Sequence, residues 1–196
     1  MGSMEALPLQ ARGYAGTYKL VGGRPSLDLI NTVSWPGTER EHDWLDSAEN
    51  LQRWLRAVGL LAAKGRSPDL KSVAQLRSDL ADVLRPLAHG EKPARAAVEE
   101  INERIERASA RRRLDPGTLG WVWKTPEDAV QSLAPLVLDA AELIASDHER
   151  LRYCPSCDWL FEDQTRNGQR RWCDMADCGS RDKARRYYRR VQKGQA

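Results

Sequence analysis

The sequence predicts a mainly α fold of the α+β class, in which a helical N-terminal domain contains one small β-hairpin and a compact cysteine module follows. Three observations support this prediction. Apolar residues recur at helical spacing before the cysteines, two short alternating runs flank a Pro-Gly turn, and all four cysteines fall in the last quarter of the chain. The 196 residues suffice for one good core and a small appended module.

Three parts are expected along the chain: a flexible arm over residues 1–16, a helical domain over 17–149 and the cysteine module over 150–196. Pro25 suits the first turn of a short helix, and Asp46 with Glu49 forms a capping box for a second helix that Gly59 ends. Two longer helices are expected over about residues 69–89 and 93–110.

A β-hairpin comes next, because apolar residues alternate on both sides of the turn Asp115-Pro116-Gly117. Thr125 caps a further helix with Pro126 at its first position. This helix is expected to reach about His148 and to lead into the cysteine module.

Composition and charge indicate a globular protein with a basic tail. Hydrophobic residues make up 41% and charged residues 30% of the chain. The net charge of +3 hides an asymmetry, because residues 150–196 contain 12 Lys and Arg against 6 Asp and Glu, whereas the preceding residues contain 19 against 22. A tail with a balance of +6 favours an acidic partner.

Neither a membrane span nor an export signal stands out. The most apolar run, around residues 133–145, is interrupted by Asp139 and Glu142, and the first residues lack the charged start and apolar core of a signal peptide. We therefore expect a cytoplasmic protein with no membrane partner. Because the cytoplasm is reducing, we expect the four thiols to be unpaired. Pairing in disulfides is the alternative.

The cysteines form two pairs, Cys154 with Cys157 and Cys173 with Cys178. A gap of two residues lets one backbone turn present two sulfurs to one ion, and two pairs close a tetrahedral tetrathiolate site, which suits Zn²⁺. Four cysteine ligands leave no position for water, so a structural role is favoured over a catalytic one.

Between the pairs we expect a second hairpin, with Trp159 and Phe161 on one strand, a turn at Asn167-Gly168 and residues 169–172 as the returning strand. Ser180 is expected to cap the helix that follows the last ligand. Such a module is treble-clef-like or zinc-ribbon-like. It has little core of its own, so zinc contributes much of its folding energy.

The last helix has two different faces. Ala184, Tyr187, Tyr188 and Val191 form an apolar stripe that is expected to pack on the hairpin. The remaining surface is almost entirely cationic, with Asp182 as its acid. The residues predicted to contact nucleic acid are Arg170, Arg171, Arg181, Lys183, Arg185, Arg186, Arg189, Arg190 and Lys193.

DNA is the expected partner, because arginine also recognises guanine in the major groove. RNA binding, protein interaction and a basic surface without a specific partner are the alternatives. Aromatic residues exposed on the hairpin would favour RNA, whereas burial of Trp159, Phe161 and Trp172 would favour duplex contact through the helix. In a further hypothesis, oxidation of the thiolates ejects zinc and acts as a redox switch.

Two segments resemble known families. The pattern Cys154-x-x-Cys157-x-Trp159-x-Phe161-x-Asp163, with Arg170-Arg171-Trp172-Cys173-x-Met175 and Cys178-Gly179-Ser180-Arg181-x-Lys183-Ala184, resembles the CGNR zinc finger. The segments Leu27-Asp28-Leu29-Ile30-Asn31-Thr32, Leu51-x-x-Trp54-Leu55 and Gly59-Leu60-Leu61 resemble the ABATE domain, which is paired with that finger.

This resemblance implies a bacterial, stress-linked transcription regulator with Zn²⁺ on the four cysteines and DNA contacted by the finger. Ser180 stands where the family has the Asn of its name. Both residues cap helices well, so we expect this difference to leave the fold unchanged. It affects any contact that the family's Asn would make with a DNA base.

A regulator of this design would use its larger domain to sense a small-molecule effector or to form a homodimer. Asp28, Asn31 and Thr32 place polar groups on an apolar helix, and Arg77 is flanked by core leucines, so these four are candidates for a ligand pocket. Alternatively, Asn31 and Thr32 satisfy backbone groups and Arg77 faces solvent. No catalytic motif stands out, and an enzyme is not expected.

Overall fold

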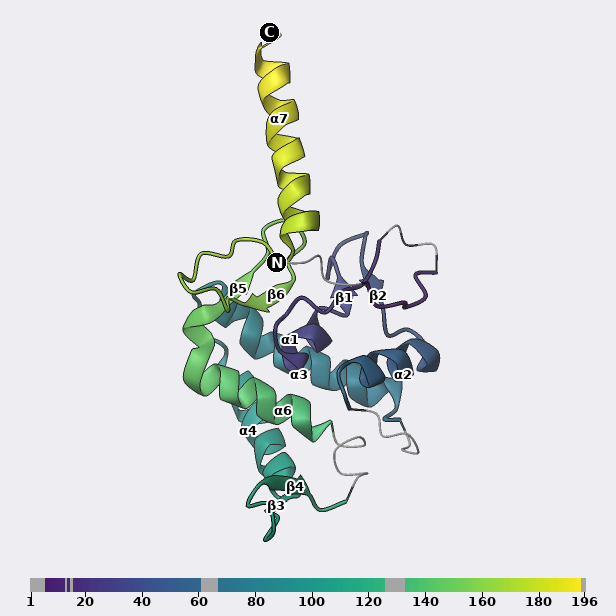
Figure 1. Cartoon of the computed structure of the whole chain (residues 1–196), viewed down its shortest axis with the longest axis vertical. Helices are drawn as coiled ribbons and strands as arrows, with labels where there is room; N and C mark the ends of the chain where they lie inside the picture. The colour runs from purple at the N-terminus through teal and green to yellow at the C-terminus, as the bar shows by residue number, and fades with distance from the viewer. Residues whose placement is uncertain (1–5, 13, 15, 61–66, 126–132, 195–196) are drawn as a thin grey trace.

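The computed structural model describes residues 6–12, 14, 16–60, 67–125 and 133–194. Within these residues the protein is mainly helical, with small two-stranded antiparallel sheets, which confirms the predicted fold class. None of the described helices combines the length and the apolar character that a bilayer crossing requires. The last helix projects from a helical body, and the β3–β4 hairpin lies at the opposite end of the molecule (Figure 1).

The helices and strands are described in chain order. They are α1 (Pro25–Ile30), β1 (Val33–Ser34), β2 (His42–Asp43), α2 (Ala48–Ala57), α3 (Leu70–Ala88), α4 (Arg95–Ser109), β3 (Arg112–Leu114), β4 (Trp121–Trp123), α6 (Ala134–Glu142), β5 (Leu151–Tyr153), β6 (Leu160–Glu162) and α7 (Ser180–Gly194). A π-helical turn (Leu143–Asp147) and a 3₁₀ turn (His148–Arg150) join α6 to β5, and a second π-helical turn, η3 (Met175–Gly179), precedes α7.

The short helix α1 lies at the centre of the body, packed against α3, α6 and β6 (Figure 1). Every residue of α1 after Pro25 is buried. A helix of six residues is too short to be stable alone in water, so α1 depends on these tertiary contacts.

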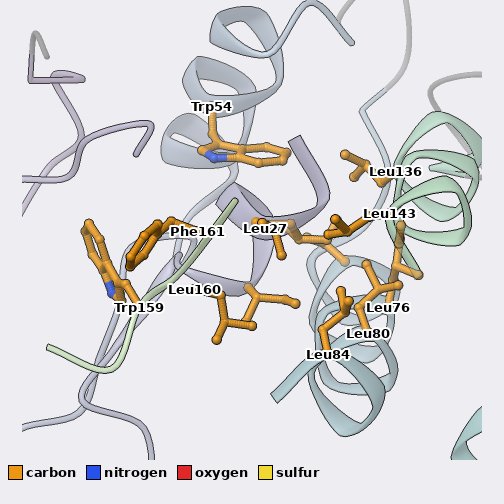
Figure 2. Close-up of a cluster of buried hydrophobic side chains, with 14 of the residues drawn as sticks. Leu27, Trp54, Leu76, Leu80, Leu84, Leu136, Leu143, Trp159, Leu160 and Phe161 are labelled. Atoms are coloured by element: carbon orange, nitrogen blue, oxygen red, sulfur yellow. The ribbon is translucent and has the colours of Figure 1, made fainter. Parts of the chain in front are cut away.

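One continuous hydrophobic core joins the helical domain to the cysteine module (Figure 2). Leu27 of α1 and Trp54 of α2 belong to the same buried cluster as Leu160 and Phe161 of β6, and all four are at most 1% exposed. The cysteine module therefore shares the core of the larger domain, although the sequence predicted the two as separate domains.

Polar contacts fix β6 against the α1 segment. The Asn31 side chain donates to the Leu160 carbonyl and accepts from the Leu160 amide, both at 2.8 Å. The Glu162 amide donates to the Gly22 carbonyl at 2.8 Å, and Arg24 forms an ion pair with the Glu162 carboxylate at 3.2 Å. Together these contacts set the register of the module on the body.

Local contacts account for two differences from the expected helix starts. Ser47, and not Asp46, caps α2, since its Oγ accepts from the Asn50 amide at 3.2 Å. Leu133 has a left-handed φ of 51°, so α6 begins at Ala134. The expected helix start at Pro126 lies outside the described residues.

The described part of the expected flexible arm contacts the body. Leu7 pairs with Tyr18 in an antiparallel bridge. The Gln10 amide donates to Asn50 Oδ1 at 2.9 Å, while Asn50 Nδ2 donates back to the Gln10 carbonyl at 3.1 Å. These backbone contacts hold the segment against α2, an arrangement that its lack of a periodic pattern did not predict.

Replacing Asn31 by Ala would remove both hydrogen bonds to Leu160 and leave a buried amide and a buried carbonyl without partners. We expect the free energy of unfolding in urea to fall by about 2–6 kcal/mol. Asn102→Ala is the control, because Asn102 makes one exposed hydrogen bond within α4, to Glu99. Equal losses in the two variants would contradict the proposed anchoring of β6.

Candidate metal centre and nucleic-acid interface

The four cysteine sulfurs gather at one buried point. They lie within 4.8 Å of one another, and all four thiols are free. The Sγ atoms of Cys157 and Cys173 are 3.5 Å apart, and those of Cys173 and Cys178 are 3.6 Å apart. Four sulfurs bound tetrahedrally at 2.3 Å from one ion would be about 3.8 Å apart. The cluster therefore fits a structural Zn²⁺ with cysteine as every ligand.

Four buried thiols this close cannot all ionise without a cation. The hydrogen bond with Cys157 lowers the pKa of Cys154 below the ordinary thiol range. Hydrogen bonding to Cys154 raises the pKa values of Cys157 and Cys173. A bound Zn²⁺ would replace the shared protons and hold all four residues as thiolates. The cysteines are at most 8% exposed, which disfavours the redox-switch hypothesis because oxidants need access to sulfur.

The first cysteine pair sits at the tip of the hairpin formed by β5 and β6. The Cys154 amide donates to the Trp159 carbonyl at 2.8 Å, and the Asp158 amide donates back to the Cys154 carbonyl at 2.8 Å. Asp158 adopts a left-handed φ of 61°, which closes the turn around the two sulfurs. The backbone between two paired strands thus presents Cys154 and Cys157 to the same point.

The predicted returning strand over residues 169–172 is wrong, because β6 pairs with β5 instead. Side-chain contacts fold the loop after β6 back on itself. The fully buried Asp163 accepts from the Thr165 amide at 2.9 Å through Oδ1 and from the Arg170 amide at 2.7 Å through Oδ2. Gly168 has a φ of +61°, in agreement with the predicted turn there.

Arg170 does not fit the predicted nucleic-acid surface. Its guanidinium donates to the Val21 carbonyl at 3.0 Å and to the Cys173 carbonyl, and it lies over the Phe161 ring at 4.4 Å. These contacts tie the loop, the body and the second cysteine pair together. Arg170 is therefore a structural residue, whereas Arg171, stacked on Trp172 at 5.1 Å, is exposed.

In the second cysteine pair, Cys173 precedes the turn η3 that leads into α7, and Cys178 lies within it. Asp174 caps this turn by accepting from the Ala176 amide at 2.8 Å. Lys19 forms a largely buried ion pair with Asp174 at 2.7 Å, and this hydrogen bond raises the pKa of Lys19. Ser180 is already helical, so the expected N-cap at Ser180 is wrong and the capping residue is Asp174.

The apolar stripe of α7 does not pack on the hairpin. Tyr187 is 60% exposed, Tyr188 66% and Val191 37%. The β5–β6 hairpin packs on the body instead, with β5 against α3 and β6 against α1. The helix instead continues from η3 and projects away from the body (Figure 1).

Most predicted phosphate contacts lie on this projecting helix. Arg181 pairs with Asp177 at 3.2 Å, and Arg186 pairs with Asp182 at 3.0 Å. In the described part of α7, four cations have no carboxylate partner: Lys183, Arg185, Arg189 and Arg190. Three of these and Arg186 surround a hollow of about 440 Å³. Lys193 lies in α7, but its side chain is outside the described residues.

The four candidate ligand-binding residues make contacts inside the fold. Asp28 accepts from the Gly22 amide at 2.8 Å, and burial raises the pKa of Asp28 to about 7. Thr32 donates to the Leu29 carbonyl at 2.6 Å and accepts from Arg77. Asn31 binds the Leu160 backbone, so Asn31 and Thr32 satisfy backbone groups, as the alternative interpretation expected.

Arg77 differs from both interpretations of its role. Its side chain is 11% exposed and forms a two-pronged ion pair with Asp43, at 2.8 Å and 2.6 Å. It therefore joins α3 to β2 and does not face solvent.

Comparison with known families gives two matches. Residues 23–147 match ABATE, described as "Putative stress-induced transcription regulator". Residues 150–191 match the CGNR zinc finger. A search of curated proteins found no match. The second match contains the whole cysteine cluster, in agreement with a zinc site.

Replacing Cys157 by Ser would remove one thiolate and release the metal. Because the module shares the core of the body, we expect the whole chain to lose more than about 3 kcal/mol of unfolding free energy. Bound zinc is measured by mass spectrometry, and unfolding is followed by circular dichroism.

Ser156→Ala is the matched control for this change. Ser156 is the buried neighbour of Cys157, and its hydroxyl has no hydrogen-bond partner among the described residues. We expect this variant to keep its zinc and its stability. Unchanged unfolding of the helices in zinc-free Cys157→Ser would contradict a shared core.

Proposed function

Because the chain belongs to the ABATE family and carries a CGNR zinc finger, we propose that it is a zinc-dependent, DNA-binding transcription regulator. One observation supports this proposal above the others: α7 projects from the body and carries four cations without carboxylate partners among the described residues. Phosphate groups would supply the missing negative charge.

The metal would give the helix its direction. Cys173 precedes η3, Cys178 lies within it, and η3 continues directly into α7. A Zn²⁺ held by these residues and the first pair would therefore fix the base of α7 relative to the hairpin. The helix has 15 residues, a length of about 22 Å, and the major groove of B-DNA accepts a helix of ordinary diameter.

We prefer duplex DNA over RNA because, of the three aromatic residues chosen to distinguish the two partners, Trp159 and Phe161 are buried and Trp172 is partly buried. Trp159 is 8% exposed and Phe161 is fully buried, so neither offers a stacking surface for bases. The predicted contacts that remain available are the arginines and lysines of α7 together with Arg171.

The ABATE domain would act as an effector or dimerisation domain in the cytoplasm. The hydrogen bonds between Asn31 and Leu160 join its central helix directly to the hairpin that carries the first two cysteines. A conformational change around α1 would therefore be transmitted to the finger through these direct contacts and not through a flexible linker. This arrangement supports the proposed regulatory role, and no catalytic role is proposed.

Single-stranded RNA is a second candidate partner, supported by one observation. Tyr187 and Tyr188 are exposed on α7 beside the arginines, with their ring centroids 5.9 Å apart. Exposed aromatic rings next to cations are typical of surfaces that stack unpaired bases. Genome-wide selection of bound DNA fragments, repeated with single-stranded RNA of the same sequences, separates the two partners.

Replacing Arg185 and Arg189 by Ala together should weaken binding to duplex DNA. If each residue neutralises one phosphate, the negative slope of log K against log salt concentration becomes about 1.8 less steep. Fluorescence anisotropy at a series of salt concentrations measures this slope, and zinc content should stay unchanged.

The control for this variant is Arg95→Ala combined with Arg107→Ala. Both residues are exposed on α4, where they pair with Glu99 and Glu103, and the net charge changes equally. We expect the control to keep the wild-type slope. If the α7 variant also keeps it, these two arginines do not contact phosphate.

A further inference from the structure

One side of the cysteine cluster faces a hollow of about 350 Å³ between the body and the finger. Cys157, Cys173 and Cys178 are among the residues that line this hollow, and each of them is at most 8% exposed. The sulfurs on this side are therefore the ones that side chains around the hollow can contact.

A zinc ion bound by four cysteines leaves a buried negative charge. The four thiolates outweigh the two positive charges of Zn²⁺, so the loaded centre is an anion. A buried charge is costly unless other groups compensate it. Groups that donate hydrogen bonds to the ligands of a metal commonly raise the affinity of the protein for that metal. We therefore looked for an N–H donor or a cation next to the sulfurs.

Arg181, in the first turn of α7, is such a donor. Its Nη2 donates to Cys178 Sγ at 3.2 Å. Its Nε pairs with Asp177 Oδ1, also at 3.2 Å. The planar guanidinium thus makes two contacts with the turn η3, and the ion pair with Asp177 orients it toward the sulfur. A hydrogen bond from a cation to a thiolate is stronger than one between neutral groups.

The other cations around the hollow contact different groups. Lys19 pairs with Asp174 at 2.7 Å, and the guanidinium of Arg40 lies over the Trp35 ring at 4.5 Å. Among the described residues, Arg181 is the one cation that hydrogen-bonds a cysteine sulfur. Compensation of the charge on sulfur at this side of the cluster therefore depends on Arg181.

We propose that Arg181 strengthens the binding of Zn²⁺. Its guanidinium, oriented by Asp177, donates to the Cys178 thiolate and offsets part of the negative charge of the loaded centre. The sequence placed Arg181 among the phosphate contacts, whereas these two contacts give it a role in the metal site. This role requires a zinc-loaded finger but no bound DNA.

Replacing Arg181 by Gln tests this role, because it removes the cation next to Cys178 and keeps a good helix former in α7. We expect the zinc affinity of the full chain to fall about 10–100-fold, the loss that is typical when a group hydrogen-bonded to a metal ligand is removed. Competition for zinc with EDTA, followed by the zinc that stays with the protein, measures the affinity.

The control is Arg166→Gln, in the loop between the two cysteine pairs. Arg166 is exposed, and its side chain makes no hydrogen bond or ion pair within the described part of the chain. The change removes the same charge from the finger without removing a contact to sulfur, so we expect wild-type zinc affinity. Equal affinities of Arg181→Gln and Arg166→Gln would overturn the proposed role.

Co²⁺ in place of zinc separates an action on the sulfur from a general loss of stability. A hydrogen bond from a cation lowers the energy of the sulfur lone pair. Its removal in Arg181→Gln should therefore move the sulfur-to-cobalt charge-transfer band to longer wavelength. A band at the wild-type position would show that Arg181 does not act on the sulfur, even if the variant bound metal less tightly.

If Arg181→Gln fails to fold, Arg181→Lys decides the question. Lysine keeps the positive charge and the helix propensity, but its ammonium lacks the planar fork that contacts Asp177 and Cys178 together. We expect a smaller loss of zinc affinity and a smaller shift of the cobalt band in the same direction. Wild-type affinity together with a wild-type band would overturn the two-pronged contact.

Discussion

The docking of β6 onto the α1 segment is the contact on which the other features depend. Asn31 acts as a partner for the Leu160 backbone, and the Gly22 carbonyl accepts from Glu162. A side chain at Gly22 could not be accommodated, because its Cβ would lie 2.8 Å from Leu27 Cβ and 3.0 Å from the Asp28 amide. Without this close approach the hairpin that carries Cys154 and Cys157 would have no fixed place on the body.

The zinc site lies between two parts of the chain that differ in burial. On one side, the cysteine hairpin is part of the core, so metal binding and folding of the body are linked. On the other side, α7 is anchored mainly through η3 and is otherwise exposed. A bound metal would therefore connect the buried β5–β6 hairpin to the exposed, cationic helix α7. The direction of α7 depends on a few residues around Cys173 and Cys178.

Local signals in the sequence predicted the helices well and the strand pairing poorly. The expected helix over residues 69–89 agrees with α3. Asp69 caps this helix by accepting a hydrogen bond from the amide of Ser72, the third residue of α3. The strand pairing predicted in the finger is wrong, because β6 pairs with β5, which precedes it, and hydrogen bonds to Asn31 hold β6 against the α1 segment. Arg170 shows the same limit: its pairing with the Val21 carbonyl spans 149 positions and leaves no local trace.

The same reasoning explains why polar residues near the core were misleading as candidate ligand contacts. Asp28, Asn31 and Thr32 are polar because backbone groups of a six-residue helix and of β6 need partners. A polar side chain in the core is therefore no sign of a ligand contact where the neighbouring backbone groups need a hydrogen-bond partner.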